Sequence, residues 1–266
     1  MITVEAESDH VTVEYMNLGE ANGDAILLVG NVKDIHIRGN EMFDNSRQGV
    51  SIVGGKSIVI EENEIHHTQG TSPQFGIDIE SRSYSSSDIE IRFNHFHHNR
   101  GGDIVNTDGR NVLIEDNILE QGEGNQYIDG PLVYWKNADL TIRANEITML
   151  SVSVNNWNGI IMYSGDFEKT NPATTYIYNN IFHHCGVYMY KGADLNIHDN
   201  YMINGHVCFK EMTNLTLKDN KIETTSSDVW AYRFLQVSGS ASGNKFNDVL
   251  YTIPLSSEPW DGDWIY

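Results

Sequence analysis

Short runs in which apolar and polar residues alternate recur along the whole chain, and most of them end at an asparagine. Early examples are IHIRGN, IVIEEN, IEIRFN and VLIEDN. In IEIRF, Ile89 and Ile91 fall on one side of an extended strand, and Glu90 and Arg92 fall on the other, because side chains of a strand alternate between its two faces. Each run therefore predicts a short β-strand with one buried face.

The asparagines that end these runs are separated by 23, 31, 23, 28, 35, 20, 20 and 24 residues. They are Asn40, Asn63, Asn94, Asn117, Asn145, Asn180, Asn200, Asn220 and Asn244. A second short strand precedes each run, and an apolar position follows each asparagine. Three strands per period of about 20–30 residues predict an all-β, right-handed parallel β-helix of about nine to ten coils.

We interpret the repeated asparagine as structural. At a tight bend, Asn tolerates left-handed backbone angles, and its amide can bond to the turn backbone. Because coils stack at about 4.8 Å, these amides are predicted to form a ladder. None of them is a catalytic candidate.

The repeat fits a single elongated domain over residues 1–250, with 251–266 as a C-terminal strand, cap or tail. No stretch is long and apolar enough to predict a membrane span, and the opening ITVEAESDH does not resemble a signal peptide. We therefore expect an excised domain that works outside the cell or on a virion surface. Cys185 and Cys208 occupy different positions of their coils, so a disulfide between them is not expected.

The formal net charge is −20. Nucleic-acid binders need a basic stripe, so this charge argues against a nucleic-acid partner. It also disfavours a polyanionic ligand unless a metal ion compensates the repulsion. The bland alternative is that the charge serves solubility.

Three carboxylates stand at predicted outward positions of the first strands of adjacent coils: Asp78, Glu80 and Asp103. Residues i and i+2 of a strand are about 6.5–7 Å apart, and neighbours on adjacent coils about 4.8 Å. Both spacings suit glycosidase carboxylates, which act by inversion or by retention. The same three residues could instead hold Ca²⁺, although no cofactor is required by the pattern. They could also be an ordinary solvated charge run.

Flanking residues could complete this site. Arg47, in the turn of the preceding coil, is the nearest candidate base or charge-neutralising partner, and Arg82 is the second. Asp129, just before a later strand, could join the carboxylates. A polysaccharide lyase would need such a base near the sugar C5.

Large aromatic residues continue the same outward stripe toward the C-terminus: Trp135, Tyr163, Tyr188 and Tyr190. Sugar rings stack on such side chains, so we predict a polysaccharide-binding platform. Insertions in the 31- and 35-residue units would border it. A subunit interface is the alternative, because exposed aromatic patches serve that role as well.

Two other motifs resemble functional sites but do not predict one. Pairs of histidines recur at 66–67, 97–98 and 183–184, and the first two pairs are predicted to stack; a turn is favoured over a metal site. The NTDG at 106–109 is similar to the Asn-Thr-Asp of polygalacturonases, but the later Asp-Asp and Gly-His-Gly of that family are missing. A polygalacturonase site is therefore not predicted.

The whole chain resembles the right-handed parallel β-helices of the pectate-lyase-like superfamily. The segment RQGVSIVGGKSIVIEENEIHHTQGTSPQFGIDIE, 47–80, is similar to repeats of bacterial and phage β-helix proteins, including tailspike and polysaccharide depolymerase domains. Members include polysaccharide lyases, glycoside hydrolases, epimerases and tailspikes, and the tailspikes are typically homotrimers made without signal peptides. The chain departs from the family in lacking a complete lyase or hydrolase signature.

The favoured function is therefore a polysaccharide-active domain that binds and cleaves a surface or cell-wall glycan along its first-strand face, as a hydrolase or a lyase. The alternative is a non-catalytic glycan-binding or structural module of a phage tail or adhesin. The identity of the glycan does not follow from the residues.

Overall fold

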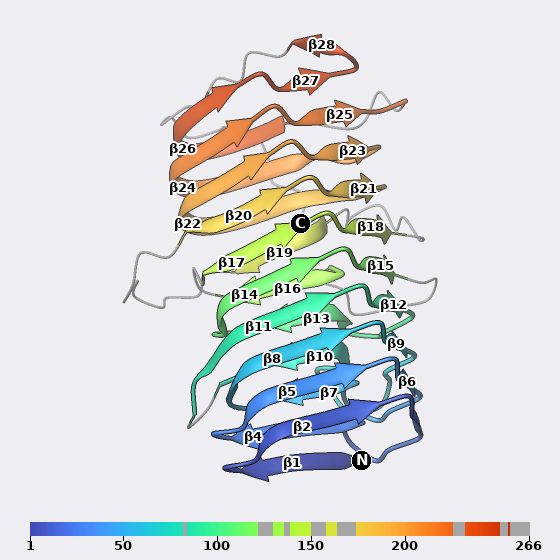
Figure 1. The fold of residues 1–266 in the computed structure, drawn as a ribbon. Coiled ribbons are helices and arrows are strands. Elements are labelled where there is room, and N and C mark those ends of the chain that lie inside the picture. The colour runs from blue at the N-terminus through green and yellow to red at the C-terminus, as the bar shows by residue number, and fades with distance from the viewer. Residues whose placement is uncertain are drawn as a thin grey trace.

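The computed structural model describes residues 1–81, 84–121, 130–135, 139–149, 158–163, 174–225, 232–250 and 255. Within them every regular element is a β-strand, and the coils stack in chain order from β1 to β28 (Figure 1). The strand pairings between coils are parallel, and in the described residues only β27 and β28 pair in the antiparallel direction. The predicted all-β parallel helix is confirmed.

Each coil in the N-terminal part has three strands. The first strands are β1 (Ile2–Ala6), β4 (Ile26–Gly30), β7 (Val50–Ile52), β10 (Phe75–Ile79), β13 (Gly102–Asn106), β16 (Leu132–Trp135) and β19 (Asn158–Tyr163). The second strands are β2 (Asp9–Glu14), β5 (Lys33–Arg38), β8 (Gly55–Glu61), β11 (Ser86–Arg92), β14 (Arg110–Glu115), β17 (Leu140–Arg143) and β20 (Thr175–Tyr178).

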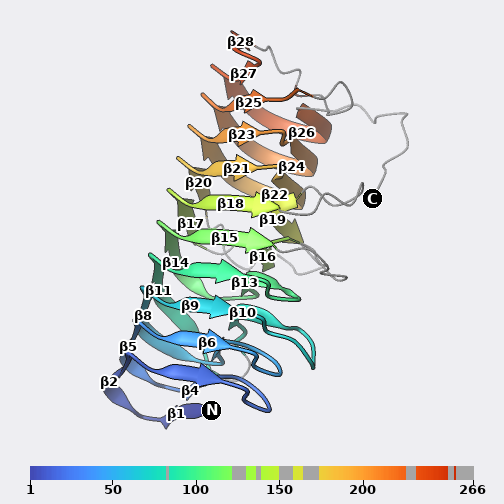
Figure 2. The same ribbon diagram turned by 90° about the vertical axis from the view of Figure 1, so that its right-hand side faces the viewer.

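The third strands form a separate 11-stranded sheet, which Figure 2 shows as a stack. Its members are β3 (Asn17–Gly19), β6 (Glu41–Phe43), β9 (Glu64–His66), β12 (His95–His97), β15 (Ile118–Gln121), β18 (Glu146–Met149), β21 (Ile181–His183), β23 (Tyr201–Ile203), β25 (Lys221–Glu223), β27 (Lys245–Phe246) and β28 (Val249–Leu250).

The last coils depart from the three-strand pattern. First and second strands run together in β22 (Gly186–His198), β24 (Val207–Lys218) and β26 (Tyr232–Ser242), and these long strands join both sets into one 17-stranded sheet. The corner survives as residues with left-handed backbone angles, such as Asp194 and Asn214. The expectation of three separate strands per coil therefore holds for the N-terminal coils and not for these three.

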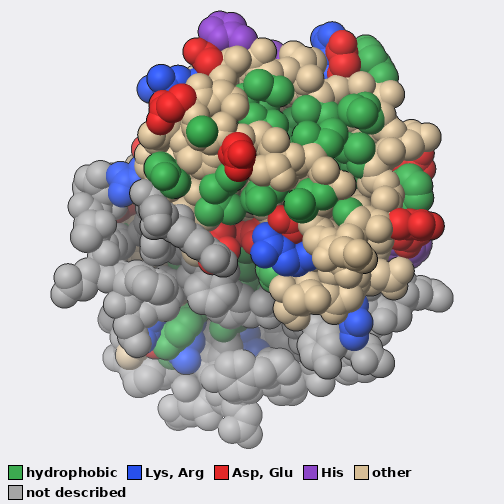
Figure 3. Space-filling model, turned by 90° about the horizontal axis from the view of Figure 1, so that it is seen from below, with side chains coloured by type: hydrophobic (Ala, Val, Ile, Leu, Met, Phe, Trp, Pro, Cys, Tyr) green, Lys and Arg blue, Asp and Glu red, His purple; other side chains and the backbone are tan. Residues whose placement is uncertain are grey.

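Aliphatic side chains from equivalent positions fill the interior. Ile35, Ile58, Ile89, Val112 and Leu140 are partners in one column through the second strands, and each is at most 2% exposed. A coil cannot bury this face by itself, so stacking supplies most of the stabilisation. At the N-terminal end, hydrophobic side chains gather on the surface (Figure 3), where Ile2, Val11 and Leu18 are only partly buried.

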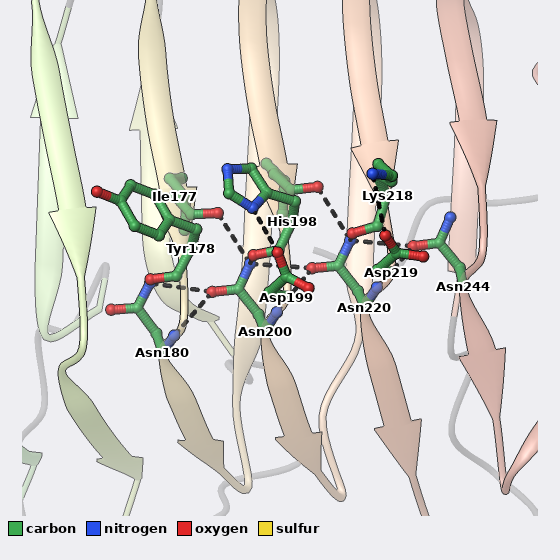
Figure 4. A network of polar contacts seen from close by, with 11 residues as sticks. Ile177, Tyr178, Asn180, His198, Asp199, Asn200, Lys218, Asp219, Asn220 and Asn244 are labelled. Carbon is green, nitrogen blue, oxygen red and sulfur yellow. Dashed lines mark hydrogen bonds and ion pairs between the residues drawn. The ribbon is translucent and has the colours of Figure 1, made fainter.

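The predicted asparagine ladder is confirmed. The backbone N–H and the Nδ2 of Asn94 both donate to Oδ1 of Asn117, and Asn117 donates in the same way to Asn145, each at 3.0 Å. Asn117 Nδ2 also donates to the carbonyls of Ile91 and Glu115. Figure 4 shows the same arrangement from Asn180 to Asn244.

The backbone explanation of the asparagine was wrong in one respect. The left-handed residue is the one before it, as at Glu62, Phe93, Asp116 and Ala144, with φ of 57°, 56°, 54° and 55°. The asparagine amide thus closes the turn that its predecessor makes. Side chains as different as Phe93 and Ala144 take this strained conformation, so the amide bonds, rather than the local preference of the residue, hold the bend.

The prediction for the two cysteines was also confirmed. Cys185 and Cys208 are buried free thiols, and Cys208 lies opposite Tyr188, as the repeat alignment required. The described part of the chain contains no helix that is long and apolar enough to cross a membrane.

Candidate functional site

The outward positions of the first strands form stacked columns, as predicted. One column runs through Leu27, Ser51, Asp78, Val105, Val133, Ile161 and Tyr188. A neighbouring column contains Trp135, Tyr163, Tyr190 and Lys210. Carboxylates and aromatic residues therefore share one face, with the carboxylates toward the N-terminus.

A recess of about 210 Å³ lies on this face, across β4, β7 and β10. Its lining combines aliphatic and charged side chains: Leu27, Val29, Val53, Ser51, Arg47, Asp78 and Glu80. The structure thus brings together three of the four residues predicted to be catalytic. The aliphatic part of the lining offers an apolar surface to a ligand.

Asp78 is 6% exposed and accepts a 2.8 Å hydrogen bond from Nε2 of Gln48. Gln48 is itself fixed, because its Oε1 accepts the backbone N–H of Phe75 at 2.6 Å, which turns the amide nitrogen toward Asp78. Burial, and next the charge of Glu80, raise the pKa of Asp78 to about 7, although Arg47 and Gln48 act to lower it. A carboxyl with this pKa can give or take a proton near neutral pH.

Arg47 makes a bidentate ion pair with Asp24, in which Nε and one terminal nitrogen each donate over 2.8 Å. The same terminal nitrogen lies 3.2 Å from Oγ of Ser51. The hydrogen bond to Asp24 raises the pKa of Arg47 further above its usual value, despite partial burial. This arrangement favours the charge-neutralising role over the alternative role as a base.

Asp103 does not belong to this group. Its side chain was expected to face outward beside Asp78, but it is completely buried and accepts a 3.1 Å hydrogen bond from Nδ2 of Asn99. The physical reason is a β-bulge: the N–H groups of Asp103 and Ile104 both donate to the carbonyl of Pro131, which reverses the alternation at the start of β13. Burial raises the pKa of Asp103 well above its usual range.

The aromatic platform is described only in part. Trp135 and Tyr163 lie opposite each other in β16 and β19, but their side chains lie outside the described residues. Tyr188 and Tyr190 are half-buried in β22, and Lys210 Nζ lies 5.0 Å from the centre of the Tyr190 ring. A small cluster of Phe75, Val105 and Val133 covers the face between the recess and these rings.

Two further predicted residues, Arg82 and Asp129, lie outside the described residues. Conversely, sequence reasoning missed Asp24 and Gln48, which hold Arg47 and Asp78 in place. A signal existed, because Asp24 precedes Arg47 by 23 residues, which is one repeat period. Residues one period apart stack, so the partner of a charged residue should be sought one coil away.

Comparison with known proteins gives a family and a distant relative. The family described as a right-handed β-helix region matches residues 24–166, which is more than half of the chain and includes the whole recess. The Bacillus subtilis (strain 168) protein YclG, described as uncharacterized, is 26% identical over 230 residues, covering 74% of this chain. The chain spans 39% of the length of that relative. No solved structure matches the chain.

Proposed function

The chain belongs to the right-handed β-helix family, which fits a polysaccharide-related role, and from that premise we propose that it binds a neutral glycan along the first-strand face and hydrolyses it at the recess. The observation that carries this proposal is the pKa of Asp78, raised to about 7 beside Glu80. Glycoside hydrolysis needs a carboxyl group that can give a proton, with a second carboxyl group near it.

In the proposed reaction, protonated Asp78 gives its proton to the leaving oxygen of the glycosidic bond. Glu80 directly follows β10 and lies two residues from Asp78, at a Cα spacing of about 6.5–7 Å. It takes a proton from the water that attacks the anomeric carbon while the glycosidic bond breaks. That spacing suits a water molecule between Glu80 and the sugar, and therefore inversion of the anomeric carbon. Asp24 and Arg47 hold the charge balance and the shape of the recess.

The charges around the recess favour hydrolysis of a neutral polymer over elimination from an acidic one. Arg47 is held by Asp24, so its positive charge is already compensated, and Glu80 adds a further carboxylate to the recess. A uronate would meet repulsion here, whereas a neutral sugar can place its apolar side against Leu27, Val29 and Val53. Calcium remains an alternative for the pair Asp78 and Glu80, without Asp103.

The polymer would run along the stacking direction toward the aromatic rows. Trp135 is two coils above Glu80, a separation of about 10 Å, and Tyr190 lies two coils further. Tyr188 and Tyr190 offer half-buried rings on which sugars can stack. The competing proposal for these rings is a subunit interface, for example in a homotrimer of an extracellular or virion-surface protein.

The test is release of reducing ends from a panel of neutral and acidic bacterial polysaccharides. Hydrolysis of a neutral glycan without a new ultraviolet-absorbing double bond supports the proposal, and loss of that activity in Asp78→Asn and Glu80→Gln assigns the residues. Glu90→Gln, a carboxylate on β11, is the matched control and should keep activity. Sensitivity to EGTA would assign calcium to the recess.

Other outcomes would overturn the proposal in distinct ways. An unsaturated product means a lyase. If the chain binds polysaccharides of the panel but cleaves none of them, it is a glycan-binding or structural module. Full activity of the Asp78→Asn, Glu80→Gln double variant places the chemistry elsewhere, and dissociation of an oligomer by Tyr190→Ala assigns the aromatic residues to an interface.

A further inference from the structure

A cluster of five histidines occupies the outer side of the third-strand sheet. Its members are His66 at the end of β9, His95 and His97 in β12, and the residues that follow these strands, His67 and His98. The ring of His66 stacks on that of His97 at 4.6 Å and 7°, and the ring of His67 stacks on that of His98 at 4.8 Å and 0°. The stacking predicted for these pairs is therefore confirmed, and their nitrogen atoms converge.

The nitrogen positions are more informative than the stacking. Nδ1 of His66 lies 2.7 Å from Nδ1 of His67, and Nδ1 of His97 lies 2.8 Å from Nδ1 of His98. At this distance one nitrogen of each pair carries a proton and the other presents a lone pair. In each pair, one proton therefore lies between two Nδ1 atoms, and each of these atoms could bind a metal.

Carboxylates decide which nitrogen presents the lone pair. Oε1 of Glu64 lies 3.1 Å from Nε2 of His97, and Oε1 of Glu41 lies 3.5 Å from Nε2 of His66. A neutral imidazole that donates its Nε2–H to a carboxylate keeps a lone pair on Nδ1. Histidines that bind a metal usually donate their other ring N–H to such a carboxylate, to a backbone carbonyl or to water.

We propose that His66, His67 and His97 bind one divalent transition-metal ion of the Zn²⁺ or Ni²⁺ type. One nitrogen from each of these residues lies within 4.8 Å of the other two. Two nitrogens on a tetrahedral Zn²⁺ are about 3.3 Å apart, so the His66–His67 pair has to open by about 0.6 Å. His67 shifts its proton from Nδ1 to Nε2, and no oxidant or further reactant is needed.

The surroundings favour a cation and allow its entry. Glu41, Asp44, Glu64 and Glu120 stand around the cluster, and His67 and His98 are exposed to solvent. The side chains of His66 and His97 are only 15% and 16% exposed, so the inner ligands are held by packing against Phe43 and against each other. Imidazole nitrogen selects transition metals over Ca²⁺ and Mg²⁺, which take oxygen ligands.

The third histidine pair of the chain supplies the matched control. His183 also has a carboxylate partner, with Oε1 of Glu146 at 3.1 Å from its Nε2. Its neighbours on the adjacent coils are Thr148 and Ile203 instead of histidines. Two adjacent histidines without a stacked partner therefore provide two ligands where the cluster provides three.

The experiment is isothermal titration of the intact chain with ZnCl₂ and NiCl₂, with CaCl₂ as the oxygen-selective comparison. We expect one transition-metal ion per chain. His66→Asn with His97→Asn should weaken the affinity at least 10- to 100-fold, and His183→Asn with His184→Asn should change it less than twofold. Far-UV circular dichroism checks that each variant keeps its fold.

A second variant keeps the proposal testable if the first one unfolds. Ile203→His with Asn204→His places a stacked pair beside His183 and His184, and should raise the number of bound ions from one to two. The proposal is overturned if the wild-type chain binds neither metal. It is also overturned if the variant with His66→Asn and His97→Asn binds the metals as tightly as the wild-type chain, or if the variant with His183→Asn and His184→Asn loses as much affinity as that variant.

Discussion

The asparagine ladder and the recess are both built from polar residues one repeat apart, yet they differ in how their polar atoms are satisfied. Along the ladder, each neutral amide donates to the next coil and accepts from the previous one. In the recess, Asp78 accepts a hydrogen bond from Gln48, lies near Glu80 and faces an aliphatic lining.

The difference between the ladder and the recess follows from the cost of burying an amide compared with that of burying a carboxylate. A neutral amide can be buried at little cost when its hydrogen bonds are complete. A carboxylate buried to a similar degree keeps the cost of losing water, and its pKa rises as a result. At similar burial, Asn117 is therefore a structural residue, whereas Asp78 is the residue for which we propose a reactive role. Substitution of Asp78 should therefore change activity, and substitution of Asn117 should change stability.

The largest expected effect is on catalysis. Asp78→Asn keeps the shape of the side chain but removes the proton that the leaving oxygen requires, so glycan cleavage should fall about 10²- to 10⁴-fold. The measurement is the initial rate of reducing-end release at pH 6. Thermal stability at that pH should be equal to or above that of the wild type, because the variant removes the cost of burying an ionisable carboxyl; a variant that loses both activity and stability would make Asp78 a structural residue like Asn117.

The next effect is on stability. Asn117→Leu removes bonds to both neighbouring coils and leaves buried N–H and carbonyl groups without partners, so the free energy of unfolding should fall by about 2–4 kcal/mol. Urea denaturation followed by circular dichroism measures it. The control is Asn196→Leu, an outward strand amide in β22, which should change stability by less than about 0.5 kcal/mol. Equal losses in both variants would refute the special role of the ladder.

A smaller effect concerns the pH dependence of stability. Asp78 has a pKa of about 7 in the folded chain and 3.8 as its ordinary value, so the folded state holds more protons between these pH values. Stability should therefore fall as pH rises from about 4 to about 7, and Asp103 contributes in the same direction.

Removal of the Asp78 carboxyl should flatten this profile. In Asp78→Asn the fall in stability between pH 4 and pH 8 should be smaller than in the wild type, which denaturant titrations across this pH range can measure. A profile with the wild-type slope would mean that Asp78 is ionised throughout, and would remove the basis for its role as a proton donor.

The smallest effect concerns the aromatic rows. Tyr190→Ala should weaken binding of the cleaved glycan about 3- to 10-fold, because one stacking ring is lost while the recess is untouched. Tyr176→Ala is the control, since Tyr176 is exposed on β20, away from the first-strand face. Unchanged glycan binding in Tyr190→Ala would restrict the ligand to the recess.

The periodic features of this protein could be predicted, and the local exceptions could not. Alternation and asparagine spacing were enough for the stacked coils, for the ladder and for the outward position of Asp78. The reversal at Asp103 depends on a bulge opposite Pro131, which no alternation rule anticipates. Likewise, the raised pKa of Asp78 depends on its burial, and the pattern did not predict the recess that Asp78 shares with Leu27, Val29 and Val53.

The ladder also separates the length of a repeat from its register. Neighbouring rungs keep 3.0–3.1 Å bonds whether 20 or 35 residues lie between them. The stacking of the coils is thus fixed by the asparagine bonds and not by the number of residues between them. Spacings of 20 and of 35 residues both leave the next asparagine in the same bonded position. Loops beside the first-strand face can therefore be exchanged by a protein engineer while the coils keep their stacking. In evolution, the same tolerance allows new binding specificities on an unchanged fold.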